Sequence, residues 1–372
     1  MPRMSEKAQP IDDINAQLAG LRGRIDQLDE KIITLLNERA NVVIEVGKVK
    51  HDRNSPVYAP DRERAVLERV RRLNAGPISD ACIMAIWREL MSGSIALERP
   101  MRVGYLGPPG SFSHLASRRK FGASVEYDAV DDIRAVFEEV QRGHVDIGLV
   151  PIENSTHGGV NETLDSFLDT TVQVYGEVLI NIHHNLLSHH PPEDIKRVYS
   201  KAEALAQCRH WLGVQLQHAE RVPAASSSRA AALAAEEPGA AAIGSALAAE
   251  MYGLQIQFAN IEDQANNVTR FFIIAKESAK PSGDDKTSIM FTTAHRAGAL
   301  ADVLDAFKKF GLNLTHIDKR PSKRENWEYY FFVDCLGHQS DENVQHAIEE
   351  ARTHCLHLTV LGSFPRAADV IE

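Results

Sequence analysis

Residues 100–113, PMRVGYLGPPGSFS, mark the point at which one pattern of apolar residues gives way to another. Arg102 to Leu106 is predicted to form a short β-strand, which turns through glycine and proline into a helix that begins near His114. Before this stretch the apolar residues recur at helical spacing, and after it short apolar strands alternate with amphipathic helices. The sequence therefore predicts an all-α module followed by an α/β module.

The segment before the boundary begins with a long helical pattern. Its apolar residues recur in alternating steps of four and three, at Ile14, Leu18, Leu21, Ile25, Leu28, Ile32 and Leu35. This spacing predicts one long helix with a coiled-coil-like seam. The next seam position is Arg39, so a guanidinium stands where the pattern requires an apolar side chain, and we expect an anion beside it. Two further helices are predicted, one that starts after Pro60 and continues through Leu73 and one from about Ser79 to Leu97.

The cations of the first helix are spaced in a way that bears on oligomeric state. Arg39 and Lys50 lie on one face, roughly 16 Å apart along the axis, so a small dianion could bridge part of the gap. Arg22 lies roughly 25 Å before Arg39, too far for one small molecule to touch both on a single helix. If all three serve one site, Arg22 comes from a second copy, and the uncovered seam also favours an intertwined dimer. Alternatively, such arginines only solvate a helical bundle.

The stretch from Leu21 to Glu98 resembles the all-helical chorismate mutase family. The matching residues are Leu21-Arg22, Asn37-Glu38-Arg39, Val46-Gly47-Lys48-Val49-Lys50, Asp61-Arg62-Glu63 and Ser92-Gly93-Ser94-Ile95-Ala96-Leu97-Glu98. The resemblance implies a site in which the two substrate carboxylates are held by Arg22 of the partner subunit, Arg39 and Arg62. It further implies that Glu63 holds the substrate hydroxyl and that Ser94 belongs to the same site.

The resemblance implies that Lys50 and Glu98 are the catalytic residues of this module and flank the ether oxygen of the substrate. A sigmatropic rearrangement needs no nucleophile or cofactor, but it needs a compact conformer and a donor where the breaking ether bond gains negative charge. Glutamine often occupies the position of Glu98 in the family. A glutamate donates a hydrogen bond to that oxygen only when it is protonated.

Two segments of the α/β module have the same pattern of a cap, an amphipathic helix and a strand that carries Ile-Gly. They run from Asp131 to Asn154 and from Ser226 to Glu250, and we interpret them as equivalent units of two lobes. A cleft between such lobes is the expected binding site. The glycines of residues 104–113 do not form the dinucleotide fingerprint, which excludes a Rossmann site, and they leave a helix N-terminus suited to a carboxylate.

Four motifs of this module resemble prephenate dehydratase. They are Gly104-Tyr105-Leu106-Gly107-Pro108-Pro109-Gly110-Ser111-Phe112-Ser113, Val150-Pro151-Ile152-Glu153-Asn154-Ser155, Tyr199-Ser200 with Gln207-Cys208, and Thr269-Arg270-Phe271, where a polar run leads into an apolar strand predicted from Phe271 to Ala275. The resemblance implies two lobes like those of type II periplasmic binding proteins. It implies that Thr269 is catalytic and donates a hydrogen bond to the leaving hydroxide, and that Arg270 pairs with a substrate carboxylate. Asn154, Ser200 and Gln207 are implied to orient the substrate.

A linker is predicted between Lys276 and Asp285, and a βαββαβ pattern follows it. That order predicts an antiparallel sheet with helices on one face, an α+β ferredoxin-like fold. Arg296-Ala297-Gly298-Ala299-Leu300 and Asp318-Lys319-Arg320-Pro321 resemble the ACT domain of phenylalanine-regulated enzymes. The resemblance implies phenylalanine bound at a dimer interface, with Gly298, Ala299, Leu300, Arg320 and Pro321 as the effector-binding residues. The usual Glu-Ser-Arg-Pro is replaced here, which leaves the strength and identity of the effector open.

Together these patterns predict a chorismate mutase domain over residues 11–100, a prephenate dehydratase domain over 101–279 and an ACT domain over 286–366. The expected function is conversion of chorismate to prephenate and then to phenylpyruvate in phenylalanine biosynthesis, with feedback inhibition by phenylalanine. The main alternative is a non-catalytic sensor that binds an aromatic metabolite. Arg39, Lys50, Thr269 and Arg270 count against it, because a sensor needs neither the ether-facing pair nor a leaving-group donor. Arogenate as the dehydration substrate is a third possibility.

Composition limits the partners and the compartment. A formal charge of -10 gives no general attraction to nucleic acids or anionic membranes. Cys82, Cys208, Cys335 and Cys355 lie far apart, which fits buried thiols in a reducing compartment. No apolar run approaches the roughly 20 residues of a membrane span, so we expect a cytoplasmic protein. The uncovered seam of the first helix predicts that this protein is a homodimer or a higher oligomer. No cofactor or metal is expected, and the pairs His183-His184 and His189-His190 are assigned a structural or surface role.

Overall fold

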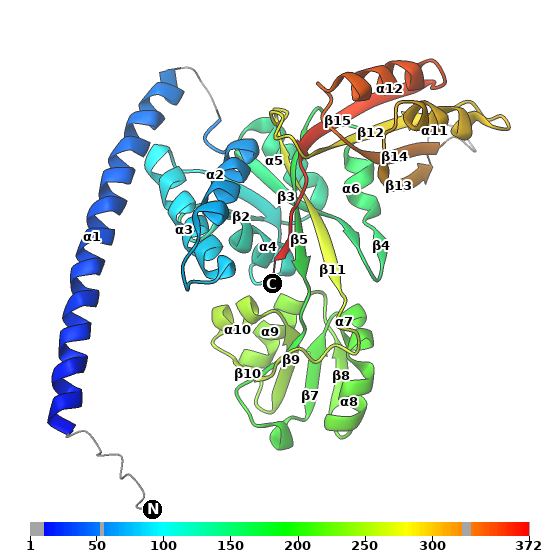
Figure 1. The fold of residues 1–372 in the computed structure, drawn as a ribbon. Helices are drawn as coiled ribbons and strands as arrows, with labels where there is room; N and C mark the ends of the chain where they lie inside the picture. Colours follow the sequence, from blue (N-terminus) through cyan, green and yellow to red (C-terminus); the bar gives the residue numbers. More distant parts are fainter. Residues whose placement is uncertain (1–10, 53–55, 322–328, 372) are drawn as a thin grey trace, which may run out of the picture.

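The computed structural model describes residues 11–52, 56–321 and 329–371. In chain order these residues form a helical module, a two-lobed α/β module and an α+β module, which is the predicted fold class. Figure 1 shows the helical and α+β modules both lying against the first lobe, while the second lobe lies on the opposite side of it. The two lobes are joined by two segments, residues 182–184 and residues 259–267. The first lobe is therefore the centre of the molecule.

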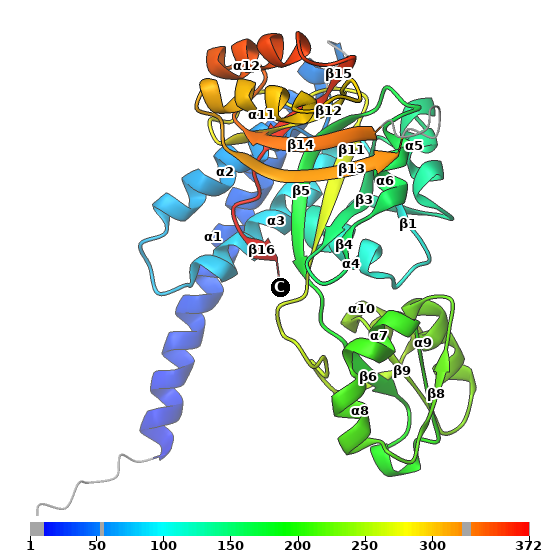
Figure 2. The same ribbon diagram turned by 90° about the vertical axis from the view of Figure 1, so that its right-hand side faces the viewer.

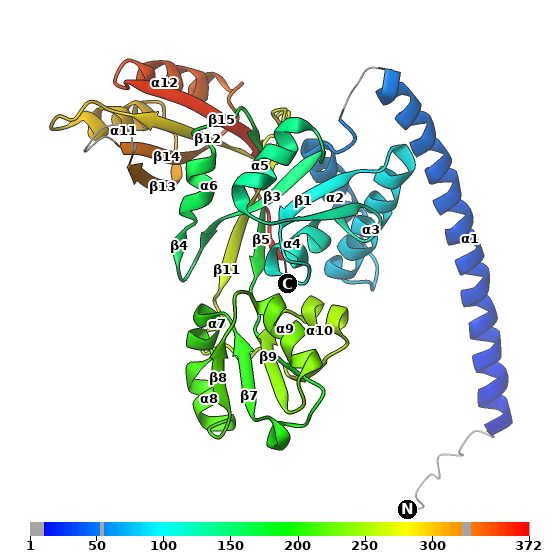
Figure 3. The ribbon, with the colours of Figure 1, turned by 180° about the vertical axis from the view of Figure 1, so that it is seen from behind.

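The helical module consists of α1 (Ile11–Asp52), α2 (Pro60–Leu73) and α3 (Asp80–Glu98). Proline in the first turn of α2 and a hydrogen bond from the Cys82 amide to the Ser79 side chain at the start of α3 are typical helix-start signals. In Figures 1 and 3, α1 extends well past the other two helices, and its N-terminal half stands away from the rest of the chain. The seam therefore lies uncovered, with Leu21, Ile25, Leu28, Ile32 and Leu35 between 52% and 62% exposed.

The first lobe is a sheet whose strands follow the order β2-β1-β3-β11-β5, with β4 paired to β3 and β16 paired to β5. Its strands are β1 (Arg102–Leu106), β2 (Glu126–Val130), β3 (Ile147–Asn154), β4 (Gly158–Gly159), β5 (Gln173–Asn181) and β11 (Val268–Ala275), and its helices are α4 (Phe112–Phe121), α5 (Ile133–Arg142) and α6 (Asn161–Ser166). β3 runs parallel to β1, and β11 runs antiparallel to β3. This places the end of β3 beside the start of β11.

The second lobe repeats this arrangement in the order β8-β7-β9-β6-β10, again with one antiparallel strand next to the third parallel strand. Its elements are β6 (Asn185–Ser188), η1 (Pro192–Asp194), β7 (Arg197–Ser200), α7 (Ala202–Gln207), α8 (Arg209–Gln215), β8 (Glu220–Pro223), α9 (Ser227–Glu236), β9 (Ala240–Gly244), α10 (Ala246–Tyr252) and β10 (Gln255–Phe258). The pairs α5–β3 and α9–β9 occupy matching places in the two lobes. The prediction of two equivalent units is confirmed.

The α+β module forms a sheet of order β13-β14-β12-β15 with helices on one face. Its elements are β12 (Asp285–Thr292), α11 (Ala299–Lys309), β13 (Leu314–Pro321), β14 (Tyr329–Leu336), α12 (Glu342–Arg352) and β15 (His357–Pro365). The other face of the sheet packs on the first lobe, where Met290, Phe332 and Phe364 join its hydrophobic core. Gly362 has a φ of 147°, and a side chain there would overlap the Val174 backbone, so glycine allows this close approach.

The chain returns to the first lobe after the last strand of this module. Figure 2 shows this tail running down to β16 (Val370–Ile371), which pairs in parallel with β5. On the way Arg71 of α2 forms an ion pair with Asp369, with 3.3 Å between Nη2 and Oδ2. The tail therefore contacts the helical module and the first lobe together.

Several sequence expectations are modified by the structure. The predicted strand that begins at Phe271 begins at Val268, so Thr269 and Arg270 lie within β11 and not in a turn before it. Buried thiols are found at Cys208 and Cys335, but Cys82 is exposed on α3. Among the described residues, no helix combines the length and the apolarity needed to cross a membrane.

Candidate active sites

The first candidate site lies where α1 crosses α3. Arg39 Nη1 donates a hydrogen bond to Ser94 Oγ at 2.6 Å, and Lys50 Nζ lies 2.8 Å from Glu98 Oε2. Gly47 allows this crossing, because a Cβ at this position would lie 3.2 Å from the Glu98 Cα atom. The structure thus brings together, in two pairs, four residues that the sequence assigned to one site.

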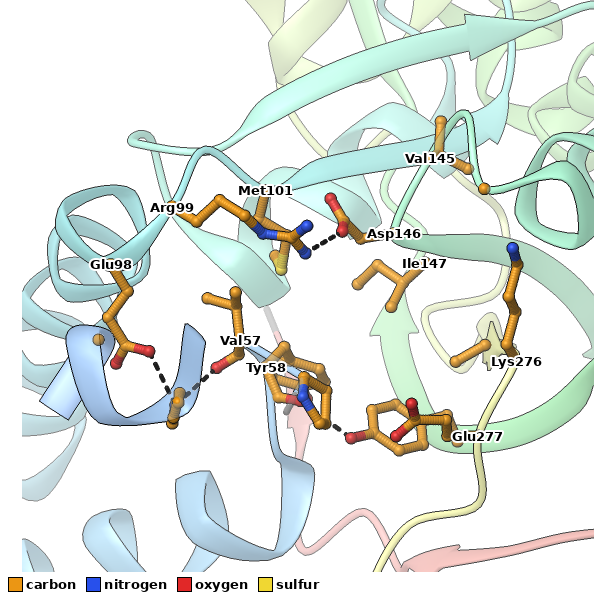
Figure 4. Close-up of a pocket in the computed structure, with 16 residues that line it drawn as sticks. Val57, Tyr58, Glu98, Arg99, Met101, Val145, Asp146, Ile147, Lys276 and Glu277 are labelled. Carbon is orange, nitrogen blue, oxygen red and sulfur yellow. Dashed lines mark hydrogen bonds and ion pairs between the residues drawn. The ribbon is translucent and has the colours of Figure 1, made fainter. Parts of the chain in front are cut away.

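A cavity of about 350 Å³ separates this crossing from the first lobe, and Figure 4 shows its lining. Lys50 and Glu98 form part of its wall on the helical side, and Lys50 Nζ also donates to the Val57 carbonyl at 3.1 Å. The opposite wall includes Asp146, which pairs with Arg99, and Lys276. The ammonium of Lys50 is therefore placed at a solvent-filled space that a small anion could enter.

Other residues predicted for this site lie elsewhere in the single chain. Arg22 and Arg62 are exposed, and Arg22 is on the half of α1 that stands away from the module. The Glu63 carboxylate accepts hydrogen bonds from Tyr58 Oη at 2.8 Å and from Lys120 Nζ of the first lobe at 2.6 Å. Glu63 is thus already engaged by the neighbouring module. Within one chain, the cationic side chains predicted to bind the dianion therefore do not all meet at one site.

The second candidate site is a cavity of about 340 Å³ between the two lobes. It is lined by Phe112, Ser113, Pro151, Asn154, His157, Ile182, His184, Lys201, Glu203, Ala204, Gln207, Ser227, Asn267, Thr269 and Phe271. Three predicted residues, Asn154, Gln207 and Thr269, are brought together here from β3, α7 and β11.

A chain of hydrogen bonds runs along this cavity. Asn154 Nδ2 donates to Thr269 Oγ1 and to Asn267 Oδ1, both at 2.8 Å, and Asn267 Nδ2 donates to Gln207 Oε1 at 3.2 Å. Because Thr269 Oγ1 accepts from Asn154, its own O–H is available to donate toward a bound molecule. The Thr269 hydroxyl is therefore a hydrogen-bond donor at the wall of this cavity.

His184 and Asn267 belong to this site although neither was predicted for it. His184 Nε2 lies 2.5 Å from Gln207 Oε1, and burial lowers the pKa of the imidazole, which favours its neutral form. His184 is buried in the cavity wall, which fits the structural one of the two roles predicted for it. Asn267 could have been found from the sequence, because it precedes Thr269 by two residues and β-strand side chains alternate between faces.

Ser200 and Arg270 lie outside the lining of this cavity. The buried Ser200 hydroxyl donates to the Ile243 carbonyl at 2.9 Å and ties β7 to β9. Arg270 follows Thr269 on β11 and points to the other face of the sheet, where its Nε donates to Glu177 Oε2 at 2.7 Å. In this structure both side chains support the site and do not face it.

The predicted effector residues lie at two places in the α+β module. Gly298, with a φ of 82°, precedes α11, and buried Ala299 and partly buried Leu300 form its first turn. Arg320 near the end of β13 forms hydrogen bonds from Nε and Nη2 to the two carboxylate oxygens of Asp165 on α6, at 2.8 and 2.9 Å. Pro321, the last residue of β13, is exposed. Arg320 therefore contacts the first lobe.

These features define a protein with two separate cavities suited to small molecules and a third, α+β module. Within the described ranges, no group of three His, Cys, Asp or Glu side chains is arranged to hold a metal ion. Family models match three successive segments: chorismate mutase type II over residues 21–99, prephenate dehydratase over 103–279 and the ACT domain over 287–353.

Relatives of full length agree with this division. The chain is 43% identical to a bifunctional chorismate mutase/prephenate dehydratase of Stutzerimonas stutzeri and 42% identical to that of Aquifex aeolicus, each comparison covering 94% of this chain and 98% of the relative. A solved prephenate dehydratase from Arthrobacter aurescens, in complex with L-Phe, has 30% identity and a TM-score of 0.67 over 73% of this chain and 93% of its own. The chain belongs to the bifunctional chorismate mutase/prephenate dehydratase family and has both activities.

Proposed function

We propose that the chain converts chorismate through prephenate to phenylpyruvate in the biosynthesis of phenylalanine, and that phenylalanine inhibits it through the ACT domain. The proposal for the second step rests on the hydrogen bonding of the Thr269 hydroxyl. Its oxygen accepts a hydrogen bond from Asn154, while its proton is directed to no other described group. Prephenate loses its ring carboxylate as carbon dioxide and expels its ring hydroxyl. Since aromatisation drives this reaction, a placed substrate and a hydrogen-bond donor to the leaving hydroxide are sufficient.

For the first step we propose a homodimer in which two α1 helices pack seam to seam. The exposed seam of Leu21, Ile25, Leu28, Ile32 and Leu35 supports this, because a row of apolar side chains more than half exposed is stabilised by burial against a second copy. Such packing would bring Arg22 of the partner subunit toward the crossing of α1 and α3. The resulting site would hold both carboxylates of chorismate and present Lys50 to the ether oxygen.

Regulation by phenylalanine is supported by the relative from Arthrobacter aurescens, which was solved in complex with L-Phe. In this chain the proposed binding residues are Gly298, Ala299, Leu300, Arg320 and Pro321. The contact between Arg320 and Asp165 gives a bound effector a route to the dehydratase lobe. Replacement of the glutamate and serine of the usual motif by Asp318 and Lys319 leaves the concentration required for inhibition to be measured.

The separation of the two sites can be tested with one substrate and two variants. Purified protein supplied with chorismate is expected to form prephenate and then phenylpyruvate, each followed by chromatography, with arogenate tested in parallel as the second-step substrate. Arg39→Ala is expected to lower the first step about 100-fold or more and to leave the second, and Thr269→Ala is expected to do the reverse. Loss of both steps in either folded variant would contradict separate sites.

The shared mutase site can be tested by complementation between subunits. Arg22→Ala and Arg39→Ala homodimers are each expected to be inactive as mutases. A purified heterodimer of the two variants contains one site with both mutations and one intact site, so it is expected to recover about half of the wild-type mutase activity. An Arg24→Ala/Arg39→Ala heterodimer is a matched comparison. A heterodimer with no recovered activity would show that Arg22 serves the site of its own chain, and an active Arg22→Ala homodimer would show that Arg22 serves no site.

A further inference from the structure

The cavity between the lobes contains a cation that no motif identified. Of the described residues that line it, Lys201 is the only lysine or arginine, and burial lowers the pKa of His184, which favours its neutral form. Lys201 belongs to the second lobe, whereas Thr269 and Asn154 belong to the first. A molecule bound between the lobes would therefore meet the hydroxyl donor on one side and the ammonium on the other.

The backbone of Lys201 is firmly placed. It follows β7 directly, at the carboxyl end of a parallel strand, which is where α/β sheets bind their ligands. The preceding Ser200 is anchored to Ile243, and the Lys201 carbonyl accepts from the Leu205 amide at 3.0 Å in the first turn of α7. The side chain is exposed, and its ammonium makes no hydrogen bond or ion pair within the described part of the chain. A charged group on a fixed backbone is thus available to a ligand.

The expected substrate carries two carboxylates, and a dianion in a cavity needs at least one cationic partner. Arg270 does not supply it, because its guanidinium is buried on the other face of the sheet against Glu177 and Asp334. Glu203 lies two residues after Lys201, and helix residues at this spacing do not face each other. We propose that Lys201 binds a carboxylate of the dehydratase substrate. This inference rests on the proposed function of the cavity.

The chemistry of the reaction selects between the two carboxylates. The ring carboxylate leaves as neutral carbon dioxide, so a cation beside it would stabilise the substrate more than the transition state and would slow the reaction. The carboxylate of the pyruvyl side chain keeps its charge through the reaction and is still present in phenylpyruvate. Lys201 therefore pairs with the pyruvyl carboxylate, and it contributes to binding of substrate and product alike.

Lys201→Ala is the test of this assignment. Loss of a charge-assisted hydrogen bond is expected to raise the KM for prephenate about 10-fold or more, with a much smaller change in kcat, because the contact is equal in ground and transition states. The competitive inhibition constant of phenylpyruvate and its dissociation constant from titration calorimetry are expected to rise by the same factor. Lys201→Arg is expected to retain most of the binding, and mutase activity is expected to stay unchanged in both variants.

A control variant separates this contact from general charge effects. Arg209→Ala removes an exposed cation from the same lobe outside the cavity lining and is not expected to raise the KM. An unchanged KM in Lys201→Ala would overturn the inference. A raised KM with unchanged phenylpyruvate binding would overturn the choice of the pyruvyl carboxylate. Because calorimetry needs no turnover, a wild-type protein without dehydratase activity would contradict the proposed function, while the binding data would still decide the role of Lys201.

Discussion

Replacement of Glu177 by alanine is expected to destabilise the protein by about 3–5 kcal/mol, the usual cost of removing one partner from a buried set of charges. The Glu177 side chain is fully buried and contacts two cations, Arg270 and Lys286, whose side chains are 9% and 14% exposed. Without the carboxylate both cations would stay in the interior with too little negative charge. The variant would also lose the hydrogen bond that the Ala367 amide donates to Glu177 Oε1 at 2.9 Å.

The charges around Glu177 join two modules. Arg270 of β11 lies 2.7 Å from Glu177 of β5 and 2.6 Å from Asp334 of β14, and Lys286 of β12 lies 3.0 Å from Glu177. The contact between Arg270 Nη2 and Asp334 Oδ2 is an ion pair without the geometry of a hydrogen bond. Burial by itself would lower the pKa of Arg270, but Asp334 and Glu177 outweigh it and raise the pKa. The set is neutral in total and fixes the strand that carries Thr269 to the ACT sheet.

The effect of Glu177→Ala can be measured by denaturant unfolding followed by circular dichroism, with the transition of the dehydratase and ACT modules compared with that of the wild type. Dehydratase activity is expected to fall because β11 loses its support, and mutase activity is expected to be retained. Glu138→Ala removes a carboxylate that forms surface ion pairs with Arg134 and Arg142, so a change below about 1 kcal/mol is expected. Equal stability of the two variants would mean that the buried charges are not essential to the contact.

The predicted site residues that the structure brings together are those whose partners follow from local spacing or from a motif. Helical periodicity was sufficient to put Arg39 and Lys50 on one face of α1, because a single continuous helix fixes both angles, and in the structure both side chains contact α3. Asn154 and Thr269 came from separate motifs, and the pairing of β3 with β11 brings them together. Strand alternation would also have added Asn267 and would have turned Arg270 away from the cavity.

Three charged residues that the sequence assigned to ligand sites have partners in another module. Arg270 forms an ion pair with Asp334 of the ACT sheet, 64 positions away, Arg320 is bonded to Asp165, 155 positions away, and Glu63 to Lys120, 57 positions away. Each of them belongs to a motif, which favoured a ligand as the partner. Only the packing of modules against one another decides which of these charges face a cavity and which hold an interface, and periodicity within one module carries no information on that packing.

Asp165→Asn is expected to weaken feedback inhibition by phenylalanine about 10-fold or more while leaving the uninhibited dehydratase rate in place. The reason is the inner face of β13, where alternate side chains contact one segment of the first lobe. His316 Nδ1 lies 3.3 Å from Glu153 Oε2, the Asp318 carboxylate lies against Gly159, and Arg320 forms its two hydrogen bonds with Asp165. The strand that carries the proposed effector motif therefore touches the segment between β3 and α6, directly beside Asn154.

An effector acts on a distant site only through contacts that differ between the two states, and couplings of this kind are typically worth about 1–3 kcal/mol. The Arg320–Asp165 pair is the strongest candidate for such a contact, because it is bidentate and both side chains are partly buried. Since Asp165 belongs to the dehydratase lobe, its replacement should leave phenylalanine binding, measured by calorimetry, nearly unchanged. The Asp165→Asn variant would then bind phenylalanine nearly as well as the wild type but would be inhibited by it less.

A charge exchange makes this test specific. Arg320→Asp alone should also abolish inhibition, and the double variant Asp165→Arg/Arg320→Asp should restore part of it if the pair itself transmits the signal. Lys319→Ala is the matched control, because Lys319 lies on the outer face of β13, with its ammonium 5.2 Å from the centre of the Tyr329 ring. If phenylalanine fully inhibits Asp165→Asn at the concentration that inhibits the wild type, the Arg320–Asp165 pair does not transmit inhibition to the dehydratase site. The buried charges around Glu177 would then be the remaining described contact that could couple the effector to β11.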